Sequence, residues 1–193
     1  MASSASRSTT MDLAYIAVFA ALIIVLGFLS IPVGGAGVPI VLQNAAIILC
    51  GLVLGCRRGG LTALLVLLIG CALPVLAGGR TTLQALAGPT AGYLVGYVIS
   101  AFVAGFIAYR ARTTTSSLTL MLSIAAVLGL LIQYLCGMGG LMLRSGLSLS
   151  AAAVAQAPFL LPDIAKIIVA VLIAAGVHSA FPDLMGSSRT RHA

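Results

Sequence analysis

Charged and aromatic side chains are scarce in this chain of 193 residues: 7% of its residues are charged, 6% are aromatic, and none is tryptophan. A typical soluble domain has about 25% charged residues, which give it a polar surface. Here 61% of the residues are hydrophobic, and the mean hydropathy is +1.22. The composition excludes a soluble globular domain and predicts an integral membrane protein.

Signatures of catalysis are also missing from the sequence. No glycine-rich stretch ends in the Gly-Lys-Ser/Thr of a Walker loop, so ATP-driven work would have to be done by a partner. Ser145 and Ser148 lie on the opposite side of the last apolar run from His178, too far apart for a nucleophilic dyad. We therefore predict a protein that is not an enzyme.

The cysteines do not indicate a metal site or a cofactor. They are Cys50, Cys56, Cys71 and Cys136. All four lie within or at the ends of apolar runs, at spacings that match neither a CxxC motif nor a zinc site. We interpret them as small hydrophobic residues.

The apolar residues come in runs of about twenty, the length that an α-helix needs to cross a bilayer, whereas barrel strands would alternate over about ten. The runs predict an all-α protein with six transmembrane helices at residues 12–30, 39–56, 61–77, 90–109, 118–142 and 158–181. They form one domain, residues 1–193, with flexible cytoplasmic tails at residues 1–10 and 185–193. The first run lacks the features of a cleaved signal peptide and is expected to be retained.

Basic residues are distributed unequally between the two sides of these spans. One side carries Arg7, Arg57, Arg58, Arg110, Arg112, Arg189 and Arg191. The other side carries only Arg80 and Arg144, and Lys166 lies inside the last span. The positive-inside rule therefore predicts that both termini are cytoplasmic, in a bacterial cell membrane. Attraction to anionic lipid is sufficient to explain the net charge of +7, and nucleic acid is not an expected partner.

Three loops on the outer side, at residues 31–43, 78–89 and 137–157, are long and rich in glycine, alanine and proline. Non-helical backbone near the membrane is tolerated where it packs on protein or lines a cavity. We therefore expect these loops to cover a substrate pocket near the outer face.

Asp163 and Lys166 are opposite charges three residues apart in an otherwise uncharged run, residues 151–180. Ionisable groups at membrane depth are costly and face a partner, a cavity or a substrate. On a helix both heads share one face, roughly 8 and 12 Å along the axis from Pro158, in the outer third of the bilayer. They are candidate ligand-binding residues; the alternative is an ion pair that only makes the helix insertable.

The first span carries small residues at Ala14, Ala17 and Ala21. Small residues at this spacing let another helix approach closely in a bilayer. The face they form is a candidate surface for docking a partner, and internal packing against a neighbouring span is the alternative.

Three segments resemble the motifs of the BioY family, the biotin-binding S components of energy-coupling-factor (ECF) transporters. Leu-Pro-Val-Leu-Ala-Gly-Gly at residues 73–79 and Gly-Pro-Thr-Ala-Gly-Tyr-Leu at residues 88–94 resemble its LPVFAGG and GPTGGYL motifs. Residues 158–166 resemble PFxxGDxxK, and Pro39 with Gln43 resembles PxTxQ. Pro162, Val41 and Ala91 replace glycine, threonine and glycine of these motifs.

The resemblance implies a six-helix subunit that captures biotin from outside and is coupled to a transmembrane T protein and ATP-binding subunits. The substrate-binding residues it implies are Asp163, Lys166, Gly79, Arg80, Thr82, Tyr93, Gln43 and Phe159. Either Lys166 or Arg80 would pair with the carboxylate of biotin. The face with Ala17 and Ala21 would dock on the T protein. An S component for another vitamin, or a proton-coupled secondary transporter of a small carboxylate, remains an alternative.

Overall fold

The structure is a computed structural model in which residues 2–31, 38–111, 115–182 and 184 are described. Its elements are α1 (Ala2–Gly27), β1 (Ser30–Ile31), β2 (Ile40–Val41), α2 (Gln43–Ala72), α3 (Thr82–Ala87), α4 (Ala91–Ala108), α5 (Thr115–Ser145), α6 (Leu149–Val154) and α7 (Ala157–Ala180). Among the described residues, the five helices α1, α2, α4, α5 and α7 are long and apolar enough to cross a membrane. The prediction of an all-α membrane protein is confirmed.

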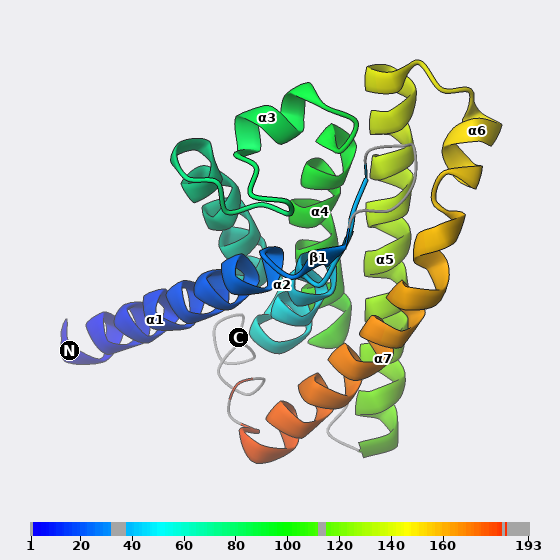
Figure 1. The fold of residues 1–193 in the computed structure, drawn as a ribbon. Helices are drawn as coiled ribbons and strands as arrows, with labels where there is room; N and C mark the ends of the chain where they lie inside the picture. The colour runs from blue at the N-terminus through cyan, green and yellow to red at the C-terminus, as the bar shows by residue number, and fades with distance from the viewer. Residues whose placement is uncertain (1, 32–37, 112–114, 183, 185–193) are drawn as a thin grey trace.

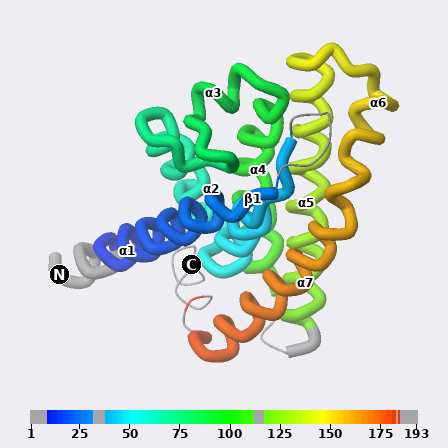
Figure 2. Tube along the Cα trace, in the orientation of Figure 1, coloured from blue at the N-terminus to red at the C-terminus, as the bar shows by residue number. Residues whose placement is uncertain are grey.

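The long helices form a bundle in which α4 packs against both α2 and α5, and α7 packs against α2 and α5. Figure 1 shows the short helices α3 and α6 at the same end of the molecule, beside the end of α5. In the tube of Figure 2, α1 runs across α2 and extends away from α5. One end of the bundle is thus covered by short helices and loops.

Helix α2 covers most of the predicted spans 39–56 and 61–77 and reverses direction between them, although residues 39–42 and 73–77 of these spans lie outside the helix. Gly55 has φ 81° and ψ 178°, a conformation that only glycine adopts readily. A Cβ on Gly59 would lie 2.8 Å from the Cα of Gly51, whereas residues eight apart on a straight helix are separated by about 12 Å. The two arms of α2, before and after Gly55, therefore lie side by side.

The side chain of Tyr109, directly after α4, and that of His178 in α7 contact carbonyl groups near the break in α2. The hydroxyl of Tyr109 donates to the Val53 carbonyl at 2.6 Å. His178 Nε2 lies 2.9 Å from the Leu52 carbonyl, which can only accept, so this ring nitrogen carries the proton. These bonds satisfy backbone acceptors near the turn, as helix ends require.

Glycines bring the helices close together. A Cβ on Gly140 of α5 would collide with the backbone of Gly92 on α4, and one on Gly137 would collide with the Tyr93 ring. The predicted loop at residues 137–157 was therefore partly wrong: α5 continues to Ser145, and α6 occupies residues 149–154. The glycines were interpreted as loop residues, but they allow close helix packing inside the membrane.

The other outer loops contain short regular elements. In the loop at residues 31–43, Ser30 pairs with Val41 and Ile31 with Ile40 in an antiparallel ladder. In the loop at residues 78–89, α3 begins with a capping box, in which Thr81 and Gln84 bind each other's backbone N–H groups. At the chain ends, residues 2–10 form the first turns of α1, and residues 185–193 lie outside the described residues.

Candidate binding site

A partly enclosed cavity, open at its mouth, lies near α3 and the starts of α2, α4 and α7. Its wall is formed by the segment before α2 and the first two residues of α2, the turn at residues 76–80, Ala85 of α3, the first half of α4, the middle of α5 and the first turns of α7. Long-range pairing of these segments creates a pocket that none of them forms alone.

Asp163 is the centre of the polar wall, with only 3% of its surface exposed. Lys166 Nζ donates to Asp163 Oδ1 at 2.7 Å and to the Val41 carbonyl at 2.7 Å. Asn44 Nδ2 donates to the same Oδ1 at 3.1 Å, and the Tyr134 hydroxyl donates to Oδ2 at 2.9 Å. A buried carboxylate with a cation and two neutral donors satisfies the requirement that a buried charge be paired and hydrogen-bonded.

The start of α7 holds these charges in place. Phe159, Asp163 and Ile167 are buried at four-residue intervals, so they form one face that turns toward the bundle. Pro158 lies in the first turn, where its missing N–H has no helical partner anyway. Gln156 Nε2, just before the helix, donates to the Tyr134 carbonyl at 3.0 Å and ties this end of α7 to α5.

Six of the eight predicted substrate-binding residues line the cavity: Asp163, Lys166, Arg80, Tyr93, Gln43 and Phe159. Gln43 is 1% exposed, and its Nε2 donates to the carbonyls of Ile23 and Val75. It therefore also connects the end of α1 with the segment after α2. Arg80 is half-buried and donates through Nε to the Ala77 carbonyl at 3.1 Å.

Gly79 and Thr82 are not among the lining residues. Thr82 is buried, and its hydroxyl donates to the Leu67 carbonyl at 2.8 Å, which joins α3 to α2. Gly79 has φ 68°, and a Cβ there would meet no atom within 4 Å. Both residues shape the segment around Arg80.

Sequence reasoning missed five polar lining residues: Asn44, Thr90, Tyr97, Gln133 and Tyr134. Gln133 is 1% exposed, and its Nε2 donates to the Asn44 carbonyl at 3.2 Å and to Ser100 Oγ at 2.9 Å. The signal was present, because an uncharged amide inside a long apolar run is also a costly residue that needs a partner. These uncharged polar residues were missed because, outside the family motifs, only charged residues were taken as candidates for the binding site.

The alanine face of α1 points away from the bundle. Ala14, Ala17 and Ala21 are exposed, whereas Ala20 and Ile23 of the same helix are 2% and 0% exposed. Internal packing of α1 is thus carried by a different set of residues. The alternative that the alanine face packs against another span of this chain does not hold for the described residues.

A bundle of apolar helices with a buried charge pair in a cavity at one end defines a membrane-embedded ligand-binding protein. The model of the BioY family matches residues 1–183. The chain is 42% identical to the biotin transporter BioY of Rhodobacter capsulatus over 170 residues, which cover 82% of this chain and 88% of the relative. It is 38% identical to the biotin transporter BioY of Rhizobium etli over 180 residues, 90% of this chain and 96% of the relative.

Among solved structures, the crystal structure of the S-component for biotin from an ECF-type ABC transporter matches with a TM-score of 0.81 and 27% identity. The match covers 90% of this chain and 93% of that one. This chain belongs to the BioY family and is a multi-pass protein of the cell membrane.

Proposed function

We propose that this protein captures biotin at the outer face of the cell membrane, as the substrate-specific subunit of an ECF-type transporter. The relatives are named biotin transporters, and the matching structure is named as a biotin S-component. The observation in this chain that carries the proposal is the buried Asp163–Lys166 pair, which lines the cavity. Without a ligand to orient, an ion pair at this depth would be a costly feature.

The cavity offers a partner for each part of biotin. The ureido ring has two N–H donors and a carbonyl acceptor, which suit the polar wall around Asp163. Tyr93 and Phe159 offer apolar surface for the thiophane ring and the alkyl chain. Arg80 is the cation we assign to the carboxylate of biotin, because Lys166 is already bound to Asp163 and the Val41 carbonyl.

Binding of biotin by the purified protein tests the function. We expect isothermal titration calorimetry to give saturable binding with one biotin per chain, and cells carrying the ATP-binding subunits to accumulate biotin. Accumulation should collapse when the ATP-binding subunits are inactivated by mutation. Collapse with a proton uncoupler alone would instead favour a proton-coupled transporter, and tight binding of a different vitamin would change the substrate.

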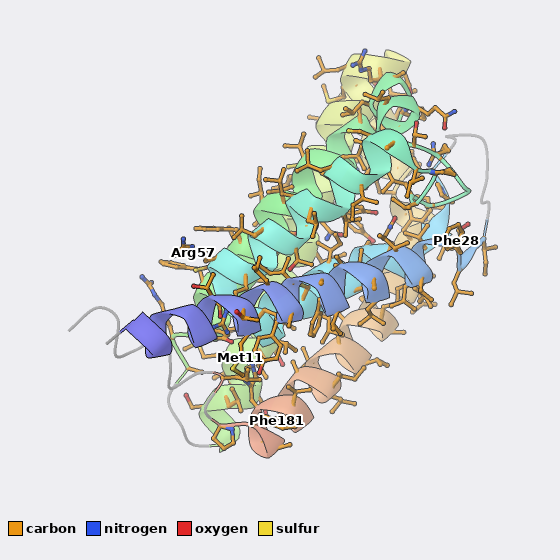
Figure 3. All side chains as sticks on the ribbon, turned by 90° about the vertical axis from the view of Figure 1, so that its left-hand side faces the viewer. Met11, Phe28, Arg57 and Phe181 are labelled. Atoms are coloured by element: carbon orange, nitrogen blue, oxygen red, sulfur yellow. The ribbon has the colours of Figure 1, made fainter. Side chains whose placement is uncertain are left out.

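Six membrane crossings and cytoplasmic termini also belong to this proposal. The two arms of α2 lie side by side, which supports two membrane crossings by this helix. With one crossing by each of the other four candidate spans, the total is six. Figure 3 shows Met11, Arg57 and Phe181 toward one end of the bundle and Phe28 toward the other. Arg58 pairs with Asp12 at the first of these ends, which is therefore the cytoplasmic one by the positive-inside rule.

Cysteine labelling in intact cells checks this orientation. In a variant whose native cysteines are replaced, a single cysteine in place of Arg58 or Arg112 should react only with a reagent that reaches the cytoplasm. Arg112 lies outside the described residues, and its prediction rests on the sequence. A cysteine in place of Arg80 should react with an impermeant reagent added from outside. The reverse pattern would place the cavity on the cytoplasmic side and contradict capture from outside.

We further propose that the partners are a transmembrane T protein and ATP-binding subunits, with the alanine face of α1 as the docking surface. Three observations support it: the face is exposed, the matching structure is an S-component, and the chain has no Walker loop.

A further inference from the structure

Two amide side chains in the cavity wall have their orientations fixed by their partners. Asn44 faces the Asp163 carboxylate, which can only accept, so its NH2 group must point there. Gln133 faces the backbone carbonyl of Asn44, also acceptor-only, so its NH2 group must point there. In both amides the NH2 group is therefore used within the protein, and the carbonyl oxygen is not involved in these hydrogen bonds.

These left-over oxygens have no partner. Among the described residues, four buried side-chain atoms lack a hydrogen bond: Asn44 Oδ1, Gln133 Oε1, Tyr93 Oη and His178 Nδ1. The first three belong to residues that line the cavity, and His178 does not. Buried polar atoms are almost always paired, so a cluster of unpaired ones in a cavity indicates a ligand that pairs them.

Asp163 alone cannot accept both ureido N–H groups. Its Oδ1 already accepts from Lys166 and Asn44, and its Oδ2 accepts from Tyr134. A carboxylate oxygen accepts about two donors, so one position remains on Oδ2. A ligand with two N–H donors needs further acceptors.

We propose that the side-chain oxygens of Asn44 and Gln133 accept hydrogen bonds from the two ureido N–H groups of biotin, while the unpaired hydroxyl of Tyr93 donates to the ureido carbonyl. Two acceptors and one donor match the two donors and one acceptor of a cyclic urea. Asp163 then acts on the ligand chiefly as a positioning residue, because it holds the amide of Asn44 in the orientation that exposes its oxygen. This inference rests on the proposed function and names the groups that select a cyclic urea.

A cycle of protein and ligand changes tests the role of Gln133. The ligands are biotin and the two cyclic-carbamate analogues in which a ring oxygen replaces one N–H or the other. We expect Gln133→Met to weaken biotin binding about 10- to 100-fold in calorimetry, the loss of one buried hydrogen bond. For the analogue without the N–H that faces Gln133, the wild-type protein should already show such a loss, and Gln133→Met should add less than about threefold to it.

Gln156→Met is the matched control, since Gln156 is a buried glutamine that donates to an α5 carbonyl but does not line the cavity. It should change the affinity for all three ligands by the same factor. Equal effects of Gln133→Met on all three ligands would reduce Gln133 to a structural residue and overturn the inference while biotin binding stands. Failure of the wild-type protein to bind biotin would overturn the proposed function itself.

A measurement on the unmutated protein guards against a variant that does not fold. The chain has four glutamines, Gln43, Gln84, Gln133 and Gln156. With an NMR-active isotope at their side-chain carbonyl carbons, one signal should shift on addition of biotin to a value typical of a hydrogen-bonded carbonyl. That shift should be missing with one of the two carbamates. If no glutamine signal responds to saturating biotin, the proposed contact does not exist.

Discussion

Asp163→Asn and Lys166→Met are each expected to weaken biotin binding by about 2–5 kcal/mol, or roughly 30- to several-thousand-fold. Asp163 accepts from Lys166, Asn44 and Tyr134, so its loss unpairs an ammonium group and releases the amide that faces the ligand. Loss of Lys166 leaves the Asp163 carboxylate without its cation in a cavity of low dielectric. Calorimetry on the purified variants measures the affinities.

The double change Asp163→Leu with Lys166→Leu separates binding from stability. Removing both charges together avoids leaving either one unpaired, so this variant should fold and melt close to the wild-type temperature. It should nevertheless fail to bind biotin, because both charged side chains of the polar wall have been removed. A double variant with near-native affinity would show that the pair only stabilises the helix, and both residues would then lose their place in the site.

The fold was predictable where long apolar runs coincide with single helices. The predicted spans 90–109 and 158–181 correspond closely to α4 and α7. The break at Gly55 was also visible, since a glycine and two arginines interrupt the apolar run there. The end of α5 was not predictable, because Gly137 and Gly140 look like loop residues until the facing helix is known.

The site was predictable as far as charge reveals it. A buried ion pair in an apolar run has few explanations, and Asp163 and Lys166 do lie in one cavity. The contribution of Asn44 and Gln133 depends on which groups face them across the bundle, 119 and 89 residues away along the chain. Sequence spacing carries no information about such contacts, and only the packed structure shows which amide atoms remain unpaired.

Replacing Ala17 and Ala21 together with tryptophan is expected to abolish assembly with the T protein and ATP-binding subunits while leaving biotin binding by the isolated protein nearly intact. Both alanines are exposed on α1, so large side chains there do not disturb the bundle or the cavity. They would hold a partner helix away from a face whose small residues permit close approach. Pull-down of the partners and calorimetry with biotin measure the two properties separately.

Val95→Trp is the control. Val95 is 54% exposed on α4, so this substitution also adds a tryptophan to the surface, but on a helix distant in sequence from α1. It should retain both assembly and binding, which would assign the effect to the alanine face rather than to tryptophan as such. The proposal requires the two properties to separate in this direction. If the α1 variant lost biotin binding but still assembled, the alanine face would not be the docking surface, which would have to lie elsewhere.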